Sequence, residues 1–121
     1  MVVILHVDNE PDTVELVRVL MTREGFEFIA AYSGKECLEK LKNNKVDLVL
    51  LDIMMPDMSG WDVYRQINKM ANMPKVAFLS VIDVSEERRH VLLESGIADY
   101  ITKPFDNEDL VKKVKKIVGV K

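Results

Sequence analysis

Polar side chains stand where several apolar segments of this chain end. The run from Leu48 to Leu51 has the composition of a strand that is buried on both faces, and it stops at Asp52. An ionised carboxylate is costly to bury without partners, so we expect Asp52 to face water, a cation or a ligand. Asp8, Ser80 and Lys103 end or follow other apolar segments in the same way. The carboxyl ends of parallel strands share one edge of a sheet, so these side chains are expected to converge there.

This set of side chains has the composition of a site for phosphoryl chemistry. It combines the carboxylates of Asp8 and Asp52 with the amide of Asn9, the hydroxyl of Ser80 and the ammonium of Lys103. Clustered carboxylates raise one another's pKa unless a cation lies between them. Oxygen ligands without a pair of Cys or His residues indicate a hard cation such as Mg²⁺. A lysine and a hydroxyl opposite that cation would bind the oxygens of a phosphoryl group.

The elements that must position these residues alternate between strand and helix five times. The expected strands are Val2 to Val7, Phe26 to Tyr32, Val46 to Leu51, Val76 to Ser80 and Ala98 to Ile101. The expected helices run from Pro11 to Gly25, from Ser33 to Asn43, from Ser59 to Met73, from Asp83 to Gly96 and from Asp106 to near the end of the sequence. Short connections between alternating elements predict an α/β fold with a parallel sheet and helices on both faces.

The length, composition and charge of the chain predict one cytoplasmic domain over residues 1–121, with no output domain after the final helix. The chain of 121 residues is 48% apolar and 31% charged, which is ordinary for a globular protein. A net charge of −3 gives no general attraction to nucleic acid. The single cysteine, Cys37, cannot form an internal disulfide, and no segment has the sequence pattern of a signal peptide or a membrane span.

Several segments together resemble the CheY-like receiver domain of two-component response regulators over essentially the whole chain. They are Val7 with Asp8, Leu50 to Pro56 with Gly60, Ser80, and Tyr100 to Phe105. Each segment is weak evidence alone, but the set stands in the order and at the spacing of that family. The resemblance implies a flavodoxin-like (βα)5 fold, doubly wound, with five parallel strands in the order 2-1-3-4-5.

The resemblance also implies a function and a set of site residues. Asp52 would accept a phosphoryl group from a sensor histidine kinase or a histidine phosphotransfer protein. Mg²⁺ or Mn²⁺ would be held by Asp8, Asp52 and the backbone carbonyl of Met54, with Asn9 as a further candidate ligand. Lys103, in a cis peptide bond to Pro104, would pair with the phosphoryl oxygens. The domain would not be a conventional enzyme, although it would catalyse its own aspartyl phosphorylation and dephosphorylation.

The implied signal passes through Ser80 and Tyr100. Ser80 would move toward the phosphoryl group, and Tyr100 would turn inward into the vacated space. The surface formed by the fourth helix, fifth strand and fifth helix would then change and bind a downstream protein that the sequence does not identify. Direct binding to nucleic acid or a membrane is not expected, and the domain would be a monomer or a weak homodimer.

Two positions depart from the family's usual pattern. Asn9 stands where a second acidic metal ligand is usual, so the site has one negative charge fewer and a lower expected affinity for Mg²⁺. Val81 stands where a small residue is usual. We hypothesise that the Val81 methyl groups crowd the phosphoryl group and slow both its entry and its hydrolysis.

Other interpretations compete with the phosphoacceptor. A phosphorylation-independent interaction module could keep the fold with a weakened metal site, as Asn9 suggests. A phosphohydrolase would need an acid two residues after the nucleophile, where this chain has Met54. The absence of a Gly-x-Gly-x-x-Gly motif after the first strand argues against a dinucleotide-binding protein. His6, in a buried strand, is interpreted as a hydrogen-bonded histidine of the core, and Tyr100 alone would be a half-buried packing residue.

Overall fold

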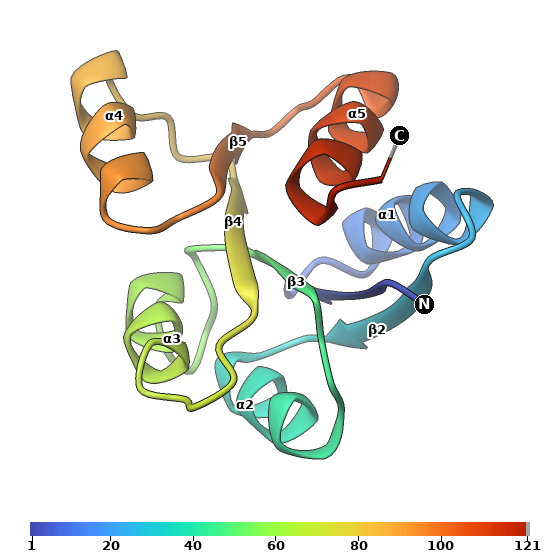
Figure 1. The fold of residues 1–121 in the computed structure, drawn as a ribbon. Helices are drawn as coiled ribbons and strands as arrows, with labels where there is room; N and C mark the ends of the chain where they lie inside the picture. The colour runs from blue at the N-terminus through green and yellow to red at the C-terminus, as the bar shows by residue number, and fades with distance from the viewer. Residues whose placement is uncertain (121) are drawn as a thin grey trace.

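Five strands and five helices alternate along residues 1–120, the part of the chain that the computed structural model describes (Figure 1). The strands are β1 (Val3–Val7), β2 (Glu27–Ala31), β3 (Leu48–Leu51), β4 (Lys75–Ser80) and β5 (Asp99–Thr102). The helices are α1 (Pro11–Arg23), α2 (Gly34–Asn43), α3 (Gly60–Ile67), α4 (Glu86–Glu94) and α5 (Asn107–Val118). Within these residues, no helix combines the length and the apolar character needed to cross a membrane.

The strands form one parallel sheet in the order β2-β1-β3-β4-β5, which confirms the predicted flavodoxin-like fold. Strand β3 lies at the centre, with Leu48 opposite Ile4 of β1 and Lys75 of β4. All four residues of β3 are buried, because helices cover both faces of the sheet. This order places β1 and β3, the strands that end at Asp8 and Asp52, directly beside each other.

The helices lie in two layers (Figure 1). Helices α1 and α5 cover one face, where their apolar side chains pack with Ile4 and Leu50. Helices α2, α3 and α4 cover the other face and pack with Leu5 and Phe78. Burial of these two apolar layers is the main stabilising contribution to the fold, and it fixes the sheet edge on which the polar residues lie.

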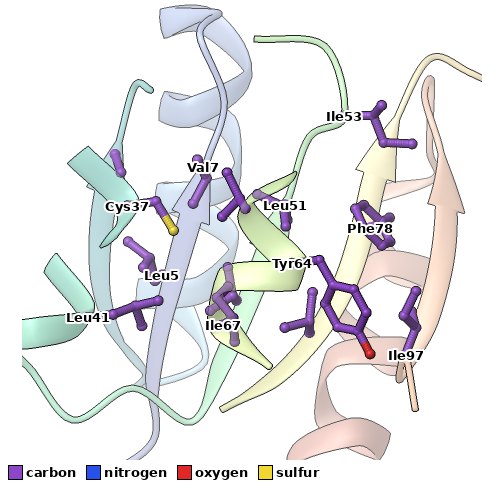
Figure 2. Close-up of a cluster of buried hydrophobic side chains, with 14 of the residues drawn as sticks. Leu5, Val7, Cys37, Leu41, Leu51, Ile53, Tyr64, Ile67, Phe78 and Ile97 are labelled. Atoms are coloured by element: carbon purple, nitrogen blue, oxygen red, sulfur yellow. The ribbon is translucent and has the colours of Figure 1, made fainter. Parts of the chain in front are cut away.

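Phe78 of β4 is the aromatic centre of the second layer. Its ring centroid lies 4.6 Å from that of Trp61, and 6.0 Å from those of both Tyr64 and Tyr100. Figure 2 shows Phe78 and Tyr64 next to each other, with the Tyr64 hydroxyl directed toward Ile97. This cluster, which includes Trp61 and Tyr64 of α3, connects α3 to β4 and β5.

Four of the five helices in residues 1–120 have a side-chain cap at their N-terminus. Ser33, Ser59, Ser85 and Asp106 each accept a hydrogen bond from a backbone N–H of the first turn. Helix α1 differs, because its N-cap residue is Glu10 and the Glu10 side chain makes no such bond. Pro11 at the first position suits this helix, since it has no N–H that would need a partner.

The boundaries of two helices differ from the prediction. Helix α3 ends at Ile67 rather than Met73, because Met70 donates its N–H to the Ile67 carbonyl in a tight turn. Helix α4 begins after Ser85 rather than at Asp83, whose carboxylate instead accepts the N–H of Val84. Leu92 is the buried apolar residue of α4, whereas Val91 is 58% exposed.

The loop from β3 to α3 is fastened to the start of α2 by Asp57. Its two carboxylate oxygens accept the N–H groups of Gly34, at 3.0 Å, and Lys35, at 2.9 Å. A Cβ atom at Gly34 would lie 2.2 Å from Cγ of Met58, so a larger residue there would displace the Met58 side chain. Burial alone would raise the pKa of Asp57, but the N–H groups of Lys35 and Gly34 lower it below its usual value.

Replacing Asp57 with Ala should therefore destabilise the protein by about 1 kcal/mol, because two N–H groups of α2 lose their acceptor. Urea unfolding at neutral pH measures this loss as a lower midpoint. Glu39→Ala is the matched control, since it removes a carboxylate from α2 that holds no other segment and should change the midpoint much less. Equal midpoints for the two variants would contradict the anchoring role of Asp57.

Candidate functional site

The carboxyl edge of the sheet brings together three of the predicted site residues, Asp8, Asp52 and Lys103. Asp8 follows β1, Asp52 follows β3 and Lys103 follows β5. Lys103 Nζ lies 2.7 Å from Asp8 Oδ2 and 3.7 Å from Asp52 Oδ2. All three side chains are less than 10% exposed, so their charges are matched within the protein rather than by bulk water.

The balance of charge at this point is negative. Lys103 also lies 3.7 Å from Oε1 of Glu10, whose side chain is 62% exposed. One ammonium thus faces two buried carboxylates and one exposed carboxylate. A further cation would reduce the repulsion that remains.

Asp8 and Asp52 have opposite pKa shifts. Burial would raise the pKa of Asp8, but the nearby His6 ring, the Lys103 ammonium and the N–H of Glu10 hold it below its ordinary value. The pKa of Asp52 is raised, mainly by burial and further by the charge of Asp8, although Lys103 opposes the shift. Asp8 is therefore the more firmly ionised of the two carboxylates.

Asp52 is the more exposed of the two buried carboxylates. Asp8 is 0% exposed, whereas Asp52 is 5% exposed. Oδ1 of Asp52 accepts the N–H of Ile53 at 2.8 Å and that of Met54 at 3.4 Å, which leaves Oδ2 facing Lys103. Backbone donors thus orient one oxygen, and the other lies beside the ammonium.

Gly60 holds the backbone that carries Asp52. Its N–H donates to the Ile53 carbonyl at 2.8 Å. A Cβ atom on Gly60 would lie 2.3 Å from the Asp52 carbonyl oxygen and 2.8 Å from Cα of Ile53, so a side chain would displace this loop. The sequence motif includes Gly60, but its close contact with the Asp52 backbone is evident only in three dimensions.

Ser80 and Tyr100 meet at the loop after β4. Ser80 is fully buried, and its Oγ accepts the N–H of Ile82 at 3.2 Å. The Tyr100 hydroxyl donates to the carbonyl of the same residue, Ile82. Tyr100 is 4% exposed, so it is buried rather than half-buried, and burial is the main cause of its raised pKa.

The remaining predicted positions surround the site. Val81 and Met54 are 59% and 58% exposed, and Asn9 is exposed beside Asp8. The Lys103–Pro104 peptide bond is cis, as predicted.

The donor atoms at this edge fit Mg²⁺ better than a soft metal. Residues 1–120 contain no group of three or more His, Cys, Asp or Glu side chains that could hold a metal ion. They do provide the two buried carboxylates of Asp8 and Asp52, together with the amide of Asn9 and the carbonyl of Met54. An all-oxygen set with few protein ligands suits Mg²⁺, which keeps several water ligands.

The prediction for His6 was only half correct. The side chain is fully buried, but neither ring nitrogen has a hydrogen-bond partner in residues 1–120. Its Nε2 lies 3.6 Å from Asp8 Oδ2, which is beyond hydrogen-bonding distance. The sequence indicated burial through the apolar neighbours of His6, but it carried no signal for the missing partner.

Comparisons with known proteins identify the family of this chain. Residues 4–115 match the family model described as the response regulator receiver domain. The chain is 38% identical over 116 residues to the alkaline phosphatase synthesis transcriptional regulatory protein PhoP of Bacillus subtilis, covering 95% of this chain and 48% of that protein. The chain therefore spans about half the length of this relative.

Solved structures with similar folds include two receivers. The response regulator TrrA of Thermotoga maritima, solved in complex with Mg²⁺ and BeF, is 36% identical with a TM-score of 0.81, and the match covers 97% of this chain and 99% of that one. A CheY-like receiver domain protein from Methanospirillum hungatei is 28% identical with a TM-score of 0.87, over 98% and 94% of the two chains.

The raised pKa of Asp52 predicts that Asp52→Asn stabilises the protein at neutral pH. A raised pKa in the folded state means that folding favours the protonated form. The favourable contribution of Asp52 is therefore complete below its unfolded pKa of about 3.9 and is lost as the pH rises through the folded value. Urea unfolding should show a higher free energy of unfolding for Asp52→Asn than for the wild type, and the difference should grow from pH 3 to pH 7. A constant difference, or a loss at pH 7, would contradict the pKa shift.

Proposed function

Because the chain belongs to the response regulator receiver domain family, we propose that it accepts a phosphoryl group on Asp52 from a histidine kinase. The observation that carries the proposal is the buried pair of carboxylates, Asp8 and Asp52, sharing the ammonium of Lys103 at the carboxyl edge of the sheet. A histidine phosphotransfer protein would be an equivalent donor. Receiver domains of response regulators are phosphorylated by such partners.

In the proposed reaction, a carboxylate oxygen of Asp52 attacks the phosphorus of a phosphohistidine. An oxygen–phosphorus bond forms as the nitrogen–phosphorus bond breaks, and the leaving nitrogen keeps the electron pair. Lys103 is 3.7 Å from Asp52 Oδ2, close enough to pair with a phosphoryl oxygen after a small movement. The Oγ of Ser80 accepts a hydrogen bond from the N–H of Ile82, so the Ser80 hydroxyl can still donate a hydrogen bond to the phosphoryl group.

Mg²⁺ or Mn²⁺ would neutralise charge between the carboxylates and the incoming phosphoryl oxygens. We assign its ligands to Asp8, Asp52 and the carbonyl of Met54, with Asn9 as a further ligand. The oxygen-only donor set supports this assignment. Further support comes from TrrA, which is 36% identical to this chain and was solved in complex with Mg²⁺ and BeF.

The proposed output runs from Ser80 to the surface of α4, β5 and α5. Ser80 and Tyr100 both bind the backbone of Ile82, so a movement of Ser80 toward a phosphoryl group alters the contacts of Tyr100. The receiver domain is proposed to occupy residues 1–121, to act in the cytoplasm and to bind a downstream protein rather than nucleic acid or a membrane.

We also propose that Val81 controls access to Asp52. Val81 follows the buried Ser80 directly, and its side chain is 59% exposed. Its methyl groups could then obstruct the hydrolytic water as well as the phosphoryl donor, which would lengthen the lifetime of the aspartyl phosphate.

Labelling with ³²P-acetyl phosphate and Mg²⁺ tests the phosphoacceptor. We expect a base-labile label on the wild type, none on Asp52→Asn, and an unchanged label on the control Glu39→Gln, which alters an exposed carboxylate on α2. A label that persists on Asp52→Asn would exclude Asp52. No label on the wild type, together with no change in Trp61 fluorescence on addition of Mg²⁺ and beryllofluoride, would favour the phosphorylation-independent module.

Asn9→Asp should lower the concentration of Mg²⁺ needed for half-saturation by roughly tenfold, because one more negative charge faces the cation. A Trp61 fluorescence titration with MgCl₂ measures this change. The control Asn72→Asp makes the same change of charge at an exposed site after α3 and should leave the titration nearly unchanged. Equal curves for the two variants would remove Asn9 from the metal site.

A further inference from the structure

His6 is a polar residue in apolar surroundings directly beneath the site. It lies on β1, in register with Ala30 of β2 and Leu50 of β3. Side chains alternate between the faces of a strand, so His6 projects on the same face as Asp8, two residues later. The ring is fully buried, and its centroid lies 6.3 Å from that of Phe28.

The hydrogen-bonding capacity of this ring is unused in the structure. Neither nitrogen has a partner in residues 1–120, although buried polar groups are nearly always paired. An apolar side chain would fill the same space without this loss, so packing does not explain a histidine here. The Asp8 carboxylate is close enough to become a partner, because its Oδ2 is 3.6 Å from Nε2 of His6.

Asp8 Oδ2 has room for a second donor. Oδ1 accepts the N–H of Glu10 at 3.0 Å, and Oδ2 accepts one hydrogen bond, from Lys103 at 2.7 Å. A carboxylate oxygen can accept two hydrogen bonds. A shift of a few tenths of an ångström would bring His6 Nε2 into hydrogen-bonding range.

Lys103 cannot remain hydrogen-bonded to Asp8 alone throughout the proposed reaction. The same ammonium lies 3.7 Å from both Glu10 and Asp52, and the proposed function requires it to turn toward a phosphoryl oxygen. When Lys103 turns, Asp8 Oδ2 loses its hydrogen-bond donor. Nε2 of His6 lies near the same oxygen, and β1 holds the His6 backbone in place. A small movement of the ring can therefore replace the hydrogen bond from Lys103.

We propose that His6 is a positioning residue for Asp8. The N–H at Nε2 of the ring donates a hydrogen bond to Asp8 Oδ2, which would keep the carboxylate oriented toward Mg²⁺ when Lys103 leaves. This role rests on the proposed function, because it assigns a task in the metal site of the same reaction. Groups that hydrogen-bond a ligating carboxylate in this way commonly change metal affinity by roughly 10- to 100-fold.

Two variants of similar size separate positioning from packing. Gln at position 6 keeps an N–H donor near the place of Nε2, whereas Met fills the space without a donor. In Trp61 fluorescence titrations, His6→Met should raise the half-saturating concentration of Mg²⁺ about tenfold, and His6→Gln should stay within about threefold of the wild type. Equal shifts for both variants, or no shift for His6→Met, would overturn the positioning role.

A second measurement uses the unsubstituted, metal-free protein. Long-range ¹H–¹⁵N correlation of the His6 ring at neutral pH should show the Nε2–H tautomer. The Nδ1–H tautomer would overturn the proposal, because Nε2 would then present a lone pair to Asp8. A wild-type protein that binds no Mg²⁺ would overturn the proposed function together with this role. If the wild type binds Mg²⁺ and is labelled, and His6→Met has the same half-saturating concentration of Mg²⁺ as the wild type, only the positioning role would be overturned.

Discussion

The carboxylates of Asp8 and Asp52 repel each other across a buried site that contains one ammonium, Lys103. Folding brings them together because β1 and β3 are neighbours in the sheet and end at the same edge. Apolar burial of the two helical layers offsets the cost of this arrangement. The protein thus keeps a concentrated, only partly neutralised negative charge at a point where hydrophobic packing on both sides prevents the strands from moving apart.

The surrounding loops limit how this charge can be relieved. Gly60 fits against the Asp52 backbone, and Asp57 fastens the same loop to α2. The Asp52 side chain therefore has little freedom to turn away from Asp8, and a bound cation would relieve the repulsion between the two carboxylates. On the other side of the site, Ile82 binds both Ser80 and Tyr100, so these two side chains are linked through the β4–α4 loop.

The sequence predicted the features that depend on pattern and missed those that depend on individual contacts. The alternation of apolar strands and amphipathic helices predicted the parallel sheet, and the family resemblance predicted the strand order. The positions of Asp8, Asp52 and Lys103 at strand ends predicted that these side chains lie close together. The end of α3 at Ile67 was missed because the periodicity of its apolar residues continues to Met70 through a turn. The unpartnered ring of His6 was missed because hydrogen-bond geometry leaves no trace in residue type.

The absence of a side-chain cap on α1 has an electrostatic consequence. In a parallel α/β fold, the helices begin at the edge where the strands end, so the positive ends of their dipoles face that edge. Of the helices in residues 1–120, the other four have a first-turn N–H group bound by a serine or aspartate of their own cap. At α1, the N–H of Glu10 instead donates to Asp8. The field of that helix is therefore directed at the buried carboxylates, where it offsets part of their negative charge.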